Sequence, residues 1–514
     1  MASTGWDIIV VGAGSAGAAL AARTAEKGAR VLLVEAGPDY RSAEMHEAWR
    51  SPNPAVALLD PQAAEGLVWT ELATARTDRQ QPGLYWRGRG AGGSSAINGQ
   101  IAIRPPMADF EEWGLPGWAP DDVLPYFAKL EDDAQFGDEP YHGRGGPTPV
   151  WRMPRADWGA VDTALAQAAR AAGHGWTEDV NAPRGSGVSP YPINSRDGRR
   201  VSVNDAYLER ARDLGTLTVR GDALVDRVLF DGDRAVGVRL ADGGELRAGT
   251  VVLSAGVIHS PAILLRSGIG PAARLRELGI GVRHQLPVGQ GMQDHPLALV
   301  AIPLAEHARR RTPHDRHTNV CVRWTSGPDA PENDMMFVGL NESVLAMAAA
   351  TPGLPTGSYG VWLNKNDSRG ELTLASADPA ADPVVRQRML SDPRDLARMR
   401  AGVRALVELA LRPETARITE GSLEKENPAL FAALDSDAAL DDHLLATVLD
   451  AQHGTSTCRM GASDAPETVV DSECRVLGVD GLRVVDASVF PSVPRANTNL
   501  ATIMAGELMA DRLA

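Results

Sequence analysis

Short apolar runs and a helix-forming stretch alternate at the beginning of the chain. Residues 6–11 form a β-branched apolar run suited to a buried strand, and residues 30–34 form a second one. The alanine-rich residues 18–27 between them predict a helix, which Gly28 ends. A strand, a helix and a second strand in this order predict the start of a parallel, doubly wound α/β sheet.

Later segments predict the remaining regular elements. Further strands are expected at residues 217–219, 224–230, 235–240 and 251–253. One long helix is expected from Pro393 to Leu411, because apolar residues recur there at helical spacing and Pro413 then stops it. Asp392 can cap its first turn, and proline suits its first position. A last helix is expected at residues 501–513.

The turn after the first strand carries a G-x-G-x-x-G motif, from Gly12 to Gly17. Gly12 permits the tight turn, Gly14 lets the backbone approach a pyrophosphate, and Gly17 lets helix and strand pack closely. The following helix offers unpaired N–H groups and a positive dipole end to the phosphates. Glu35, at the end of the second strand, can accept hydrogen bonds from ribose hydroxyls. The pattern predicts a dinucleotide site and leaves NAD and FAD open.

A second glycine-rich segment spans residues 87–99 and holds five glycines and two serines. Glycine at this density lets the backbone lie against a flat ligand. Apolar residues resume at once, at 96–97 and 101–103, so a flexible linker is the poorer interpretation. The segment therefore predicts an ordered loop against a flat bound group.

Composition narrows the classes of function. The 514 residues carry 51 Lys and Arg against 66 Asp and Glu, a net charge of −15, which lacks the basic footprint of a nucleic-acid binder. A hydrophobic share of 44% excludes a disordered chain. There is no apolar run of about 18 residues, and a strand-like run begins at Trp6. We therefore expect no transmembrane helix, no secretory signal and a cytoplasmic protein.

The cysteines argue against a disulfide framework and against a structural zinc site. Cys321, Cys458 and Cys474 are odd in number, and no two of them stand at C-x-x-C spacing. A pairing of Cys458 with Cys474 in space stays open. No metal site is predicted.

Several segments resemble the signatures of the glucose–methanol–choline (GMC) flavoprotein oxidoreductase family. Residues 87–99 resemble the first signature, and residues 254–270 resemble the second. Residues 288–295 resemble the turn that follows, and residues 453–461 and 481–497 resemble the C-terminal block. The chain is also similar in length to the small bacterial alcohol oxidases and dehydrogenases of that family.

The resemblance implies an α/β fold with two domains. A Rossmann-like FAD-binding domain is expected to assemble from residues 1–155, 196–298 and 448–514. A substrate-binding domain, with an antiparallel sheet covered by helices, is expected from residues 156–195 and 299–447. The arginine-rich residues 306–318 are interpreted as a solvated polar loop, with a lid or an anion contact as alternatives.

The resemblance also implies FAD as the cofactor. The residues expected to contact it are Gly12, Gly14, Ser15, Ala16, Gly17, Glu35, Ala36, Arg87, Gly92, Ser95, Asn98, Gly99, Val225, Ala255, Asp486, Ala487, Asn497 and Thr498. Asp486 matches a position at the ribityl and phosphate end, and Val225 matches one whose backbone meets the adenine. Non-covalent binding is expected, because residues 87–99 contain no His or Cys, where some members attach FAD covalently.

Two residues match the catalytic positions of the family. His453 matches the active-site histidine, and a neutral imidazole can accept the hydroxyl proton of an alcohol as a general base. Asn497 matches the second position and can hydrogen-bond the same oxygen. The register against Asn499 stays open, and so does a simple helix-capping role for these asparagines.

Other residues are assigned less specifically. Trp362 and Gln452 are candidate substrate contacts, and a core position for Trp362 is an equal alternative. His295 is expected to have a structural role, and His259 is expected to pack in the interior.

The implied reaction is the FAD-dependent oxidation of a small primary alcohol, aromatic or heteroaromatic, to the aldehyde. His453 would take the hydroxyl proton while hydride passes to flavin N5, and O2 or another acceptor would then receive the electrons. A hydroxynitrile lyase-like enzyme without net redox chemistry is the alternative. A photoenzyme, a non-catalytic scaffold and a reductase with two dinucleotides are less favoured, since the last needs a second G-x-G-x-x-G motif after a strand.

Overall fold

The computed structural model describes residues 5–342 and 356–513. The expected domain boundaries at residues 1 and 514, and the part of the substrate-binding segment between residues 343 and 355, lie outside the described residues.

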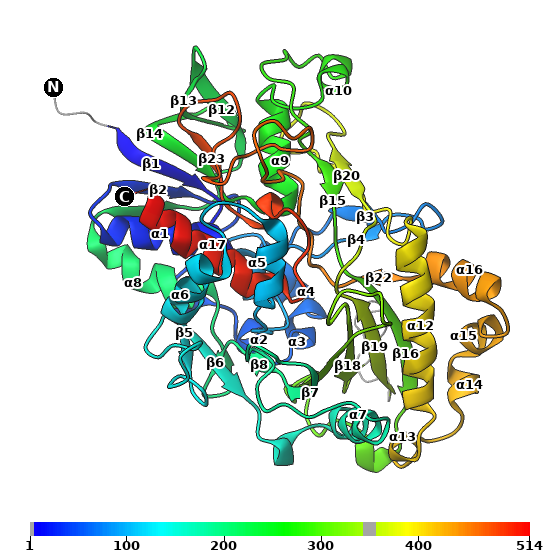
Figure 1. Cartoon of the computed structure of the whole chain (residues 1–514). Helices are drawn as coiled ribbons and strands as arrows, with labels where there is room; N and C mark the ends of the chain where they lie inside the picture. Colours follow the sequence, from blue (N-terminus) through cyan, green and yellow to red (C-terminus); the bar gives the residue numbers. More distant parts are fainter. Residues whose placement is uncertain (1–4, 343–355, 514) are drawn as a thin grey trace.

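One of the two main sheets has seven strands and contains the first two strands of the chain (Figure 1). Its main path runs in the order β11 (Leu217–Arg220), β2 (Val31–Val34), β1 (Trp6–Val11), β14 (Glu245–Leu253), β13 (Arg234–Leu240) and β12 (Val225–Asp231). Strand β23 (Leu482–Val484) pairs with the end of β14. The strands β11, β2, β1, β14 and β23 run parallel, whereas β12 and β13 form an antiparallel ribbon.

Strand β14 is longer than predicted, because it belongs to two environments. Its first half pairs with β13 and alternates between exposed and half-buried positions. Its last three residues, Val251 to Leu253, are fully buried between β1 and β23. Only this apolar end gave a strand signal in the sequence.

Helices α1 (Ser15–Glu26) and α17 (Thr498–Arg512) pack against each other beside this sheet (Figure 1). They approach closely at Gly506, where a Cβ atom would lie 2.5 Å from the carbonyl oxygen of Ala16. The helices begin at Ser15 and Thr498 rather than at the predicted residues 18 and 501. The glycine motif and the Asn-Thr-Asn segment thus stand at the starts of two adjacent helices.

A second, six-stranded sheet is antiparallel throughout. Its order is β22 (Leu449–Asp450), β16 (Pro296–Pro303), β19 (Thr356–Leu363), β18 (Met335–Leu340), β17 (Val320–Trp324) and β7 (Gly187–Pro190). Helices α7 (Ala160–Ala171) and α12 (Pro393–Ala410) pack on it (Figure 1). The expected antiparallel sheet covered by helices is confirmed.

Residues alternate between the two faces of this sheet, as the period of a strand requires. On β19, Tyr359 and Val361 pack into the core under the helices, whereas Trp362 faces the opposite side. On β18, Phe337 faces the helices and Val338 faces away from them. The face opposite α7 and α12 is therefore available to line a cavity.

Helix α12 confirms the prediction made from its sequence. It begins at Pro393, and the backbone N–H of Arg394 donates to Asp392 Oδ1 at 2.9 Å. Met399, Val403 and Leu406 are buried against the sheet, which is the apolar spacing that predicted the helix.

Smaller elements complete the chain. A five-stranded sheet has the order β15 (Gln290–Met292), β20 (Gly370–Thr373), β21 (Val384–Arg386), β3 (Ala73–Ala75) and β4 (Gly83–Leu84), a three-stranded sheet has β5 (Glu131–Asp133), β6 (Thr148–Arg152) and β8 (Pro192–Ile193), and β9 (Ser195–Arg196) pairs with β10 (Arg199–Arg200). The remaining helices are α2 (Glu47–Arg50), α3 (Ala55–Leu58), α4 (Pro61–Ala64), α5 (Met107–Trp113), α6 (Pro120–Leu130), α8 (Glu209–Ala211), α9 (Gly256–Arg266), α10 (Ala272–Glu277), α13 (Pro413–Ala416), α14 (Leu423–Glu426), α15 (Pro428–Ala433) and α16 (Asp437–Thr447).

Two large hydrophobic clusters correspond to the two main sheets. One surrounds β1, β2 and β14, and the other lies between the six-stranded sheet and α7 and α12. Cys321, Cys458 and Cys474 are buried and free, so the pairing of Cys458 with Cys474 does not form. Within residues 5–342 and 356–513, none of the helices combines the length and the hydropathy that a membrane crossing needs.

Candidate active site

A cavity of about 460 Å³ opens between the two main sheets. The carboxyl ends of β1, β2 and β14 reach it through Val11, Val34 and Ser254. Ligands of open parallel sheets bind at this end of the strands. The face of the six-stranded sheet opposite α7 and α12 lines the other side, through Val338 and Trp362. One wall of the cavity therefore has the form of a dinucleotide-binding site, and the opposite wall is apolar.

Most of the sequence-predicted site residues line this cavity. They are Gly12, Gly14, Ser15, Ala16, Glu35, Ala36, Arg87, Asn98, Gly99, Val225, Ala255, Trp362, Gln452, His453, Asp486, Ala487, Asn497 and Thr498. Residues from positions 12 to 498 meet here, because the sheet order brings distant segments together.

Gly17, Gly92 and Ser95 do not line the cavity, and their geometry shows another role. A Cβ atom at Gly17 would lie 2.0 Å from the carbonyl oxygen of Gly12, so glycine allows helix α1 to pack on the turn. Gly92 has φ +97°, which favours glycine. The Ser95 hydroxyl donates to the Gly92 carbonyl at 2.6 Å and accepts the Val203 N–H at 3.0 Å. These residues shape the walls.

The first glycine motif presents backbone to the cavity. Gly12 has φ +102°, and a Cβ atom there would lie 2.4 Å from the Ser254 carbonyl oxygen, so only glycine fits. Gly14 stands at the N-cap of α1 without a side chain. The first N–H groups of the helix and its positive dipole end therefore face the cavity, as a pyrophosphate requires.

Glu35 holds the two glycine-rich segments together. Its Oε2 accepts the N–H of Ala13 at 2.8 Å, and its Oε1 accepts the N–H groups of Gly37 and Gly90 at 2.9 Å each. Burial raises the pKa of this carboxyl, and the three N–H groups oppose that rise. The contacts fix the second glycine-rich segment against the first strand and turn, beside the place expected for a ribose.

Asp486 and Arg87 are also held by neighbouring polar groups. Asp486 accepts the N–H of Gly256 at 2.9 Å and the hydroxyl of Ser260 at 2.6 Å, which places its carboxylate at the start of α9. Arg87 donates through Nη1 to Gln452 Oε1 at 3.1 Å. The other Arg87 nitrogen, Nη2, is buried and has no hydrogen-bond partner among the described residues.

His453 and Asn497 meet at the centre of the cavity. Asn497 Nδ2 and His453 Nε2 are 3.0 Å apart, and both residues are largely buried. Asn497 stands at the N-cap of α17, but its side chain turns to the imidazole and not to the helix amides. Asn499 also lines the cavity, but its Oδ1 accepts the Ser15 hydroxyl at 2.8 Å and its side chain makes no hydrogen bond to His453. The geometry thus selects Asn497 as the partner of His453.

His295 is a site residue that the sequence reasoning missed. Its Nδ1 lies 3.0 Å from Nδ1 of His453, and its Nε2 lies 3.0 Å from the carbonyl oxygen of Pro494. The expected purely structural role omitted this contact with the imidazole of His453. The turn of residues 290–295 was visible in the sequence, but nothing in it indicated where the ring would point.

Asp294 fixes the backbone of both histidines. Its Oδ1 accepts the N–H of His295 at 2.7 Å and the N–H of His453 at 2.8 Å. Its Oδ2 accepts the hydroxyl of Tyr85 at 2.7 Å. Burial and the charge of Asp450 raise the pKa of Asp294 to about 7, and Arg87 opposes the rise. One carboxylate therefore joins the backbone at both histidines.

The apolar wall beside His453 is largely aromatic and aliphatic. Trp362 lies edge-to-face with the imidazole of His453, with ring centroids 5.4 Å apart at 67°. Leu297, Val338 and Tyr191 line the same cavity. Trp362 therefore lines the cavity while it also packs against a hydrophobic cluster, and its buried Nε1 has no hydrogen-bond partner among the described residues.

The arginine-rich loop is only partly solvated, which corrects the sequence interpretation. Arg309 and Arg311 lie near the surface, but Arg316 is buried and donates to the carbonyls of Pro52 and Gly99. His317 and Thr318, which follow it, line the cavity. The buried guanidinium ties the loop to the second glycine-rich segment.

His259 lines the cavity as well. Its ring lies 4.2 Å from that of Trp69, and burial lowers its pKa to about 3. His259 packs in the interior as expected, and its ring is also part of the cavity wall. The neutral imidazole and the indole together offer an aromatic surface to a bound group.

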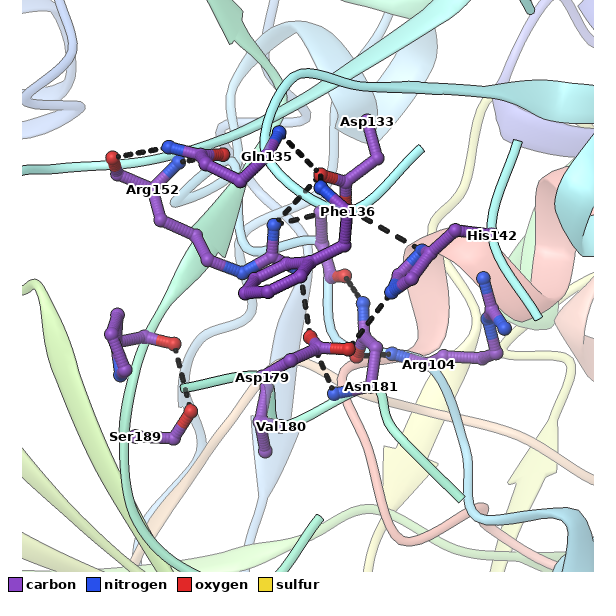
Figure 2. A network of polar contacts seen from close by, with 12 residues as sticks. Arg104, Asp133, Gln135, Phe136, His142, Arg152, Asp179, Val180, Asn181 and Ser189 are labelled. Carbon is purple, nitrogen blue, oxygen red and sulfur yellow. Dashed lines mark hydrogen bonds and ion pairs between the residues drawn. The ribbon is translucent and has the colours of Figure 1, made fainter. Parts of the chain in front are cut away.

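A second cluster of ionisable groups lies outside this cavity (Figure 2). Glu131, Asp133 and His142 place ligand-type atoms within 4.8 Å of one another, so they are a candidate metal set. Arg104 already donates to Glu131 at 2.7 Å, and Arg152 donates to both oxygens of Asp133. The guanidinium groups supply the positive charge that a metal would bring, and the arrangement fits an ion-pair network.

Known proteins resemble this chain over its whole length. Family models described as GMC oxidoreductase match residues 6–297 and residues 366–506. The chain belongs to the GMC oxidoreductase family. This GMC oxidoreductase is 36% identical to 5-(hydroxymethyl)furfural oxidase of Methylovorus sp. (strain MP688), over 100% of this chain and 99% of that protein.

Two further comparisons agree with this assignment. The GMC oxidoreductase is 33% identical to an oxygen-dependent choline dehydrogenase of Photobacterium profundum, over 99% of this chain and 93% of that protein. Its structure matches that of pyridoxine 4-oxidase from Mesorbium loti with a TM-score of 0.87 and 28% identity, over 99% of each chain.

Family membership makes the protein an FAD-dependent oxidoreductase that acts on alcohol (CH–OH) groups. The cavity fits FAD on its own evidence. Only glycine fits the turn at Gly12, and no side chain caps the first N–H groups of α1, so these groups can bind the pyrophosphate. Nη2 of Arg87 and Oδ1 of Asn497, which have no hydrogen-bond partners among the described residues, give a polar flavin end near His453.

Proposed function

We propose that this enzyme oxidises a small primary alcohol, aromatic or heteroaromatic, to the aldehyde, with His453 as the general base. The observation that supports this most strongly is the contact of His453 Nε2 with Asn497 in the cavity between the glycine wall and the apolar wall. Bound FAD would supply the hydride acceptor. The alcohol must lie where its oxygen reaches the imidazole and its carbon faces the flavin end.

His453 is suited to removing the hydroxyl proton. Burial lowers the pKa of His453 well below the ordinary value, and the charge of Arg87 adds to this effect, so the imidazole is neutral at neutral pH. A neutral imidazole has one bare nitrogen, which can accept a proton from a hydroxyl within hydrogen-bond reach. The protonated ring would then stabilise negative charge that develops on the flavin side of the cavity.

Asn497 can hold the alcohol oxygen in place. Its Nδ2 donates towards Nε2 of His453, and its Oδ1 is buried with no hydrogen-bond partner among the described residues. The amide therefore offers both a donor and an acceptor to a hydroxyl that binds beside the imidazole. Such positioning contributes to rate by reducing the loss of freedom in the transition state.

The apolar wall favours an aromatic substrate. Trp362, Tyr191 and Leu297 offer face and edge contacts to a ring, and Trp362 can also donate a hydrogen bond through Nε1. The relatives named for furfural and pyridoxine oxidation support the same class. Gln452 is a weaker candidate for substrate contact, because Arg87 and Asp450 already occupy its amide.

The site assignments support two further proposals. FAD would bind non-covalently, against the residues that line the cavity between Gly12 and Thr498. The FAD-binding segments would be 1–155, 196–298 and 448–514, with 156–195 and 299–447 forming the substrate-binding domain, a division that the two hydrophobic clusters support. Flavin fluorescence that stays with the chain on a denaturing gel would contradict non-covalent binding.

The electron acceptor is proposed as O2 or a separate carrier. The named oxidase relatives favour O2. The cytoplasmic location stays a prediction.

Anaerobic mixing of the FAD-loaded protein with a panel of primary alcohols tests the proposed reaction. We expect aromatic alcohols such as benzyl and furfuryl alcohol to bleach the flavin absorbance. Replacing His453 with Ala should slow bleaching by about 10²–10⁴-fold, the usual contribution of a general base. His443→Gln, on the distant helix α16, is the matched control and should react at the wild-type rate.

Later steps of the same experiment separate the alternatives. Fast recovery of absorbance in air indicates an oxidase, and persistent bleaching indicates a dehydrogenase with another acceptor. Bleaching by no alcohol would reject the proposal and favour the lyase-like alternative, which release of cyanide from a cyanohydrin would then reveal.

A further inference from the structure

We propose that His295 is a positioning residue that keeps the proton of neutral His453 on Nδ1, so that Nε2 is the atom that receives the alcohol proton. The inference rests on the proposed role of His453 as the base. It assigns to His295 a function in the reaction, although His295 does not line the cavity.

The carbonyl of Pro494 determines which nitrogen of His295 carries the proton. Nε2 of His295 lies 3.0 Å from that oxygen, and the side chain has no exposed surface. A carbonyl oxygen can only accept a hydrogen bond. A bare Nε2 would place two buried acceptors against each other and leave both without a donor, which is unfavourable in the interior. Nε2 of His295 therefore carries a proton.

The charge state of His295 fixes its other nitrogen. Burial lowers the pKa of His295 to about 4, and the charge of Lys365 adds to this, although the backbone groups of Pro494 and Asn364 oppose it, so the ring is neutral at neutral pH. A neutral imidazole carries one proton, and here that proton is on Nε2, so Nδ1 of His295 is an acceptor. Nδ1 of His453 lies 3.0 Å away and must therefore be the donor.

The proton on Nδ1 of His453 leaves Nε2 bare. Asn497 Nδ2 lies 3.0 Å from this nitrogen and donates to it. Each contact in the series is then a donor facing an acceptor, from the Pro494 carbonyl through His295 and His453 to Asn497. The opposite tautomer of His453 would break the contact with His295 and would point an N–H at the Asn497 amide nitrogen.

Neighbouring ionisable groups hold this pair without competing for its ring nitrogens. Asp294 accepts the backbone N–H groups of both histidines, and Tyr85 donates to the same carboxylate. Arg87 lies 3.9 Å from Asp294, Asp450 accepts from Arg76, and Lys365 pairs with Glu112. The ring nitrogens of the two histidines hydrogen-bond each other, Pro494 and Asn497, and the backbone of Asn364 also acts on the ring of His295.

The same arrangement supports the charged state of the base. When Nε2 of His453 takes the proton from the alcohol oxygen, the N–H at Nδ1 keeps its acceptor on His295. The hydrogen bond from Nε2–H of His295 to the Pro494 carbonyl polarises the ring of His295. This polarisation strengthens the hydrogen bond that Nδ1 of His295 accepts and stabilises the imidazolium of His453. No proton leaves His295, so the proton balance of the reaction is unchanged.

Two substitutions at His295 test the proposal. His295→Leu removes the acceptor for His453, whereas His295→Gln keeps one amide acceptor and one amide donor in a similar position. The wrong tautomer in a Ser-His-Asp triad costs about 10⁴-fold in kcat. Because His295→Leu allows a mixture of tautomers, we expect flavin reduction by the alcohol to slow by about 10²-fold with little change in KM. His295→Gln should recover most of that rate.

The tautomer itself gives a readout that does not depend on activity. In ¹⁵N-histidine NMR spectra of the FAD-loaded protein without substrate, Nε2 of His453 should be unprotonated and Nδ1 protonated, with His453→Gln used to assign the signals. His295→Leu should shift both signals towards a mixture, and His443→Leu should leave them unchanged. A protonated Nε2 in the wild-type protein would overturn the proposal.

The pH dependence of flavin reduction by the alcohol is a second test of the role of His295. In His295→Leu the pKa that governs flavin reduction should move downward, since the imidazolium of His453 loses its acceptor. A wild-type rate and pH profile in a folded, FAD-loaded His295→Leu enzyme would overturn the positioning role. If no alcohol reduces wild-type flavin, the proposed function fails, and the NMR tautomer still decides the role of His295.

Discussion

Trp362 presents an aromatic ring to whatever binds beside His453. Its ring centroid lies 5.4 Å from that of His453. An aromatic pair contributes about 0.5–1.5 kcal/mol beyond the area that it buries. We therefore expect Trp362→Leu to raise KM for benzyl alcohol by about tenfold, and to raise KM for a small aliphatic alcohol less. Steady-state kinetics with both alcohols measure this difference.

Trp324 provides the matched control, because it stacks on Phe337 in the core on the helix-covered face of the sheet. Trp324→Leu should lower stability and leave the ratio of the two KM values unchanged. An equal rise of both KM values in Trp362→Leu would show that the indole shapes the cavity without recognising a ring.

At the residue scale, sequence motifs identified the two residues that we propose as catalytic, but not their surroundings. His453 and Asn497 lie in recognisable blocks, and they meet at 3.0 Å. His295 was missed because its contact with His453 joins positions 158 residues apart and depends on ring orientation. Thr318 was missed because three arginines made its loop look solvated, whereas buried carbonyls accept the hydrogen bonds of Arg316.

At the element scale, the contact between α1 and α17 couples packing to cofactor binding. A Cβ atom at Gly506 would lie 2.5 Å from the Ala16 carbonyl oxygen and 3.1 Å from its Cα atom. Backbone cannot yield as a flexible side chain can, so the start of α1 would have to move. We expect Gly506→Ala to lower the free energy of unfolding by about 1–3 kcal/mol. It should also weaken FAD binding, because the start of α1 faces the expected phosphates.

Urea unfolding and titration of the apoprotein with FAD measure these effects. Gly327→Ala is the control, since nothing lies within 4 Å of a Cβ atom there. A Gly506→Ala protein with wild-type stability but weak FAD binding would contradict the packing explanation.

Local signals predicted whole elements well where packing agreed with them. The cap at Asp392 and the apolar spacing after it predicted α12, and β1 and β2 followed from buried runs. The five-stranded sheet was not predicted. Its strands β15, β20, β21, β3 and β4 are two to four residues long, and they come from three distant parts of the chain. Strands this short cannot show the alternation of polar and apolar residues by which a strand is recognised in a sequence.

At the scale of the whole molecule, the buried ionic cluster links segments that surround the active site (Figure 2). Asp179 accepts from Arg152 at 2.7 Å and pairs with His142 at 2.8 Å. Three carboxylates, of Glu131, Asp133 and Asp179, face two guanidinium groups, so a charged His142 balances the cluster. Asn181, two residues after Asp179, accepts the N–H of Arg104 at 2.8 Å, and Arg323 joins the carbonyls of Arg104 and Arg495.

The protonated state of His142 predicts a loss of stability at alkaline pH. Burial alone would lower its pKa, but the hydrogen bonds with Asp179 and Glu131 outweigh burial and raise the pKa to about 9. A group with a raised pKa in the folded state contributes stability that is complete below its unfolded pKa, near 6.5, and is lost as pH rises through 9. The contribution is on the order of 3 kcal/mol at most. We therefore expect the free energy of unfolding to fall between pH 6.5 and pH 9.5.

His142→Gln separates this effect from other alkaline changes. The amide can keep one hydrogen bond to the carboxylates but has no charge to lose, so the variant should be less stable at pH 6 and should change less towards pH 9.5. His307→Gln, in the exposed part of the arginine-rich loop, should follow the wild-type curve. The measurement is urea unfolding of the FAD-loaded protein at several pH values. The same pH slope in His142→Gln as in the wild-type protein would show that His142 is neutral when folded. The two arginines would then leave one of the three buried carboxylates unbalanced, and that carboxylate would have to carry the proton in its place.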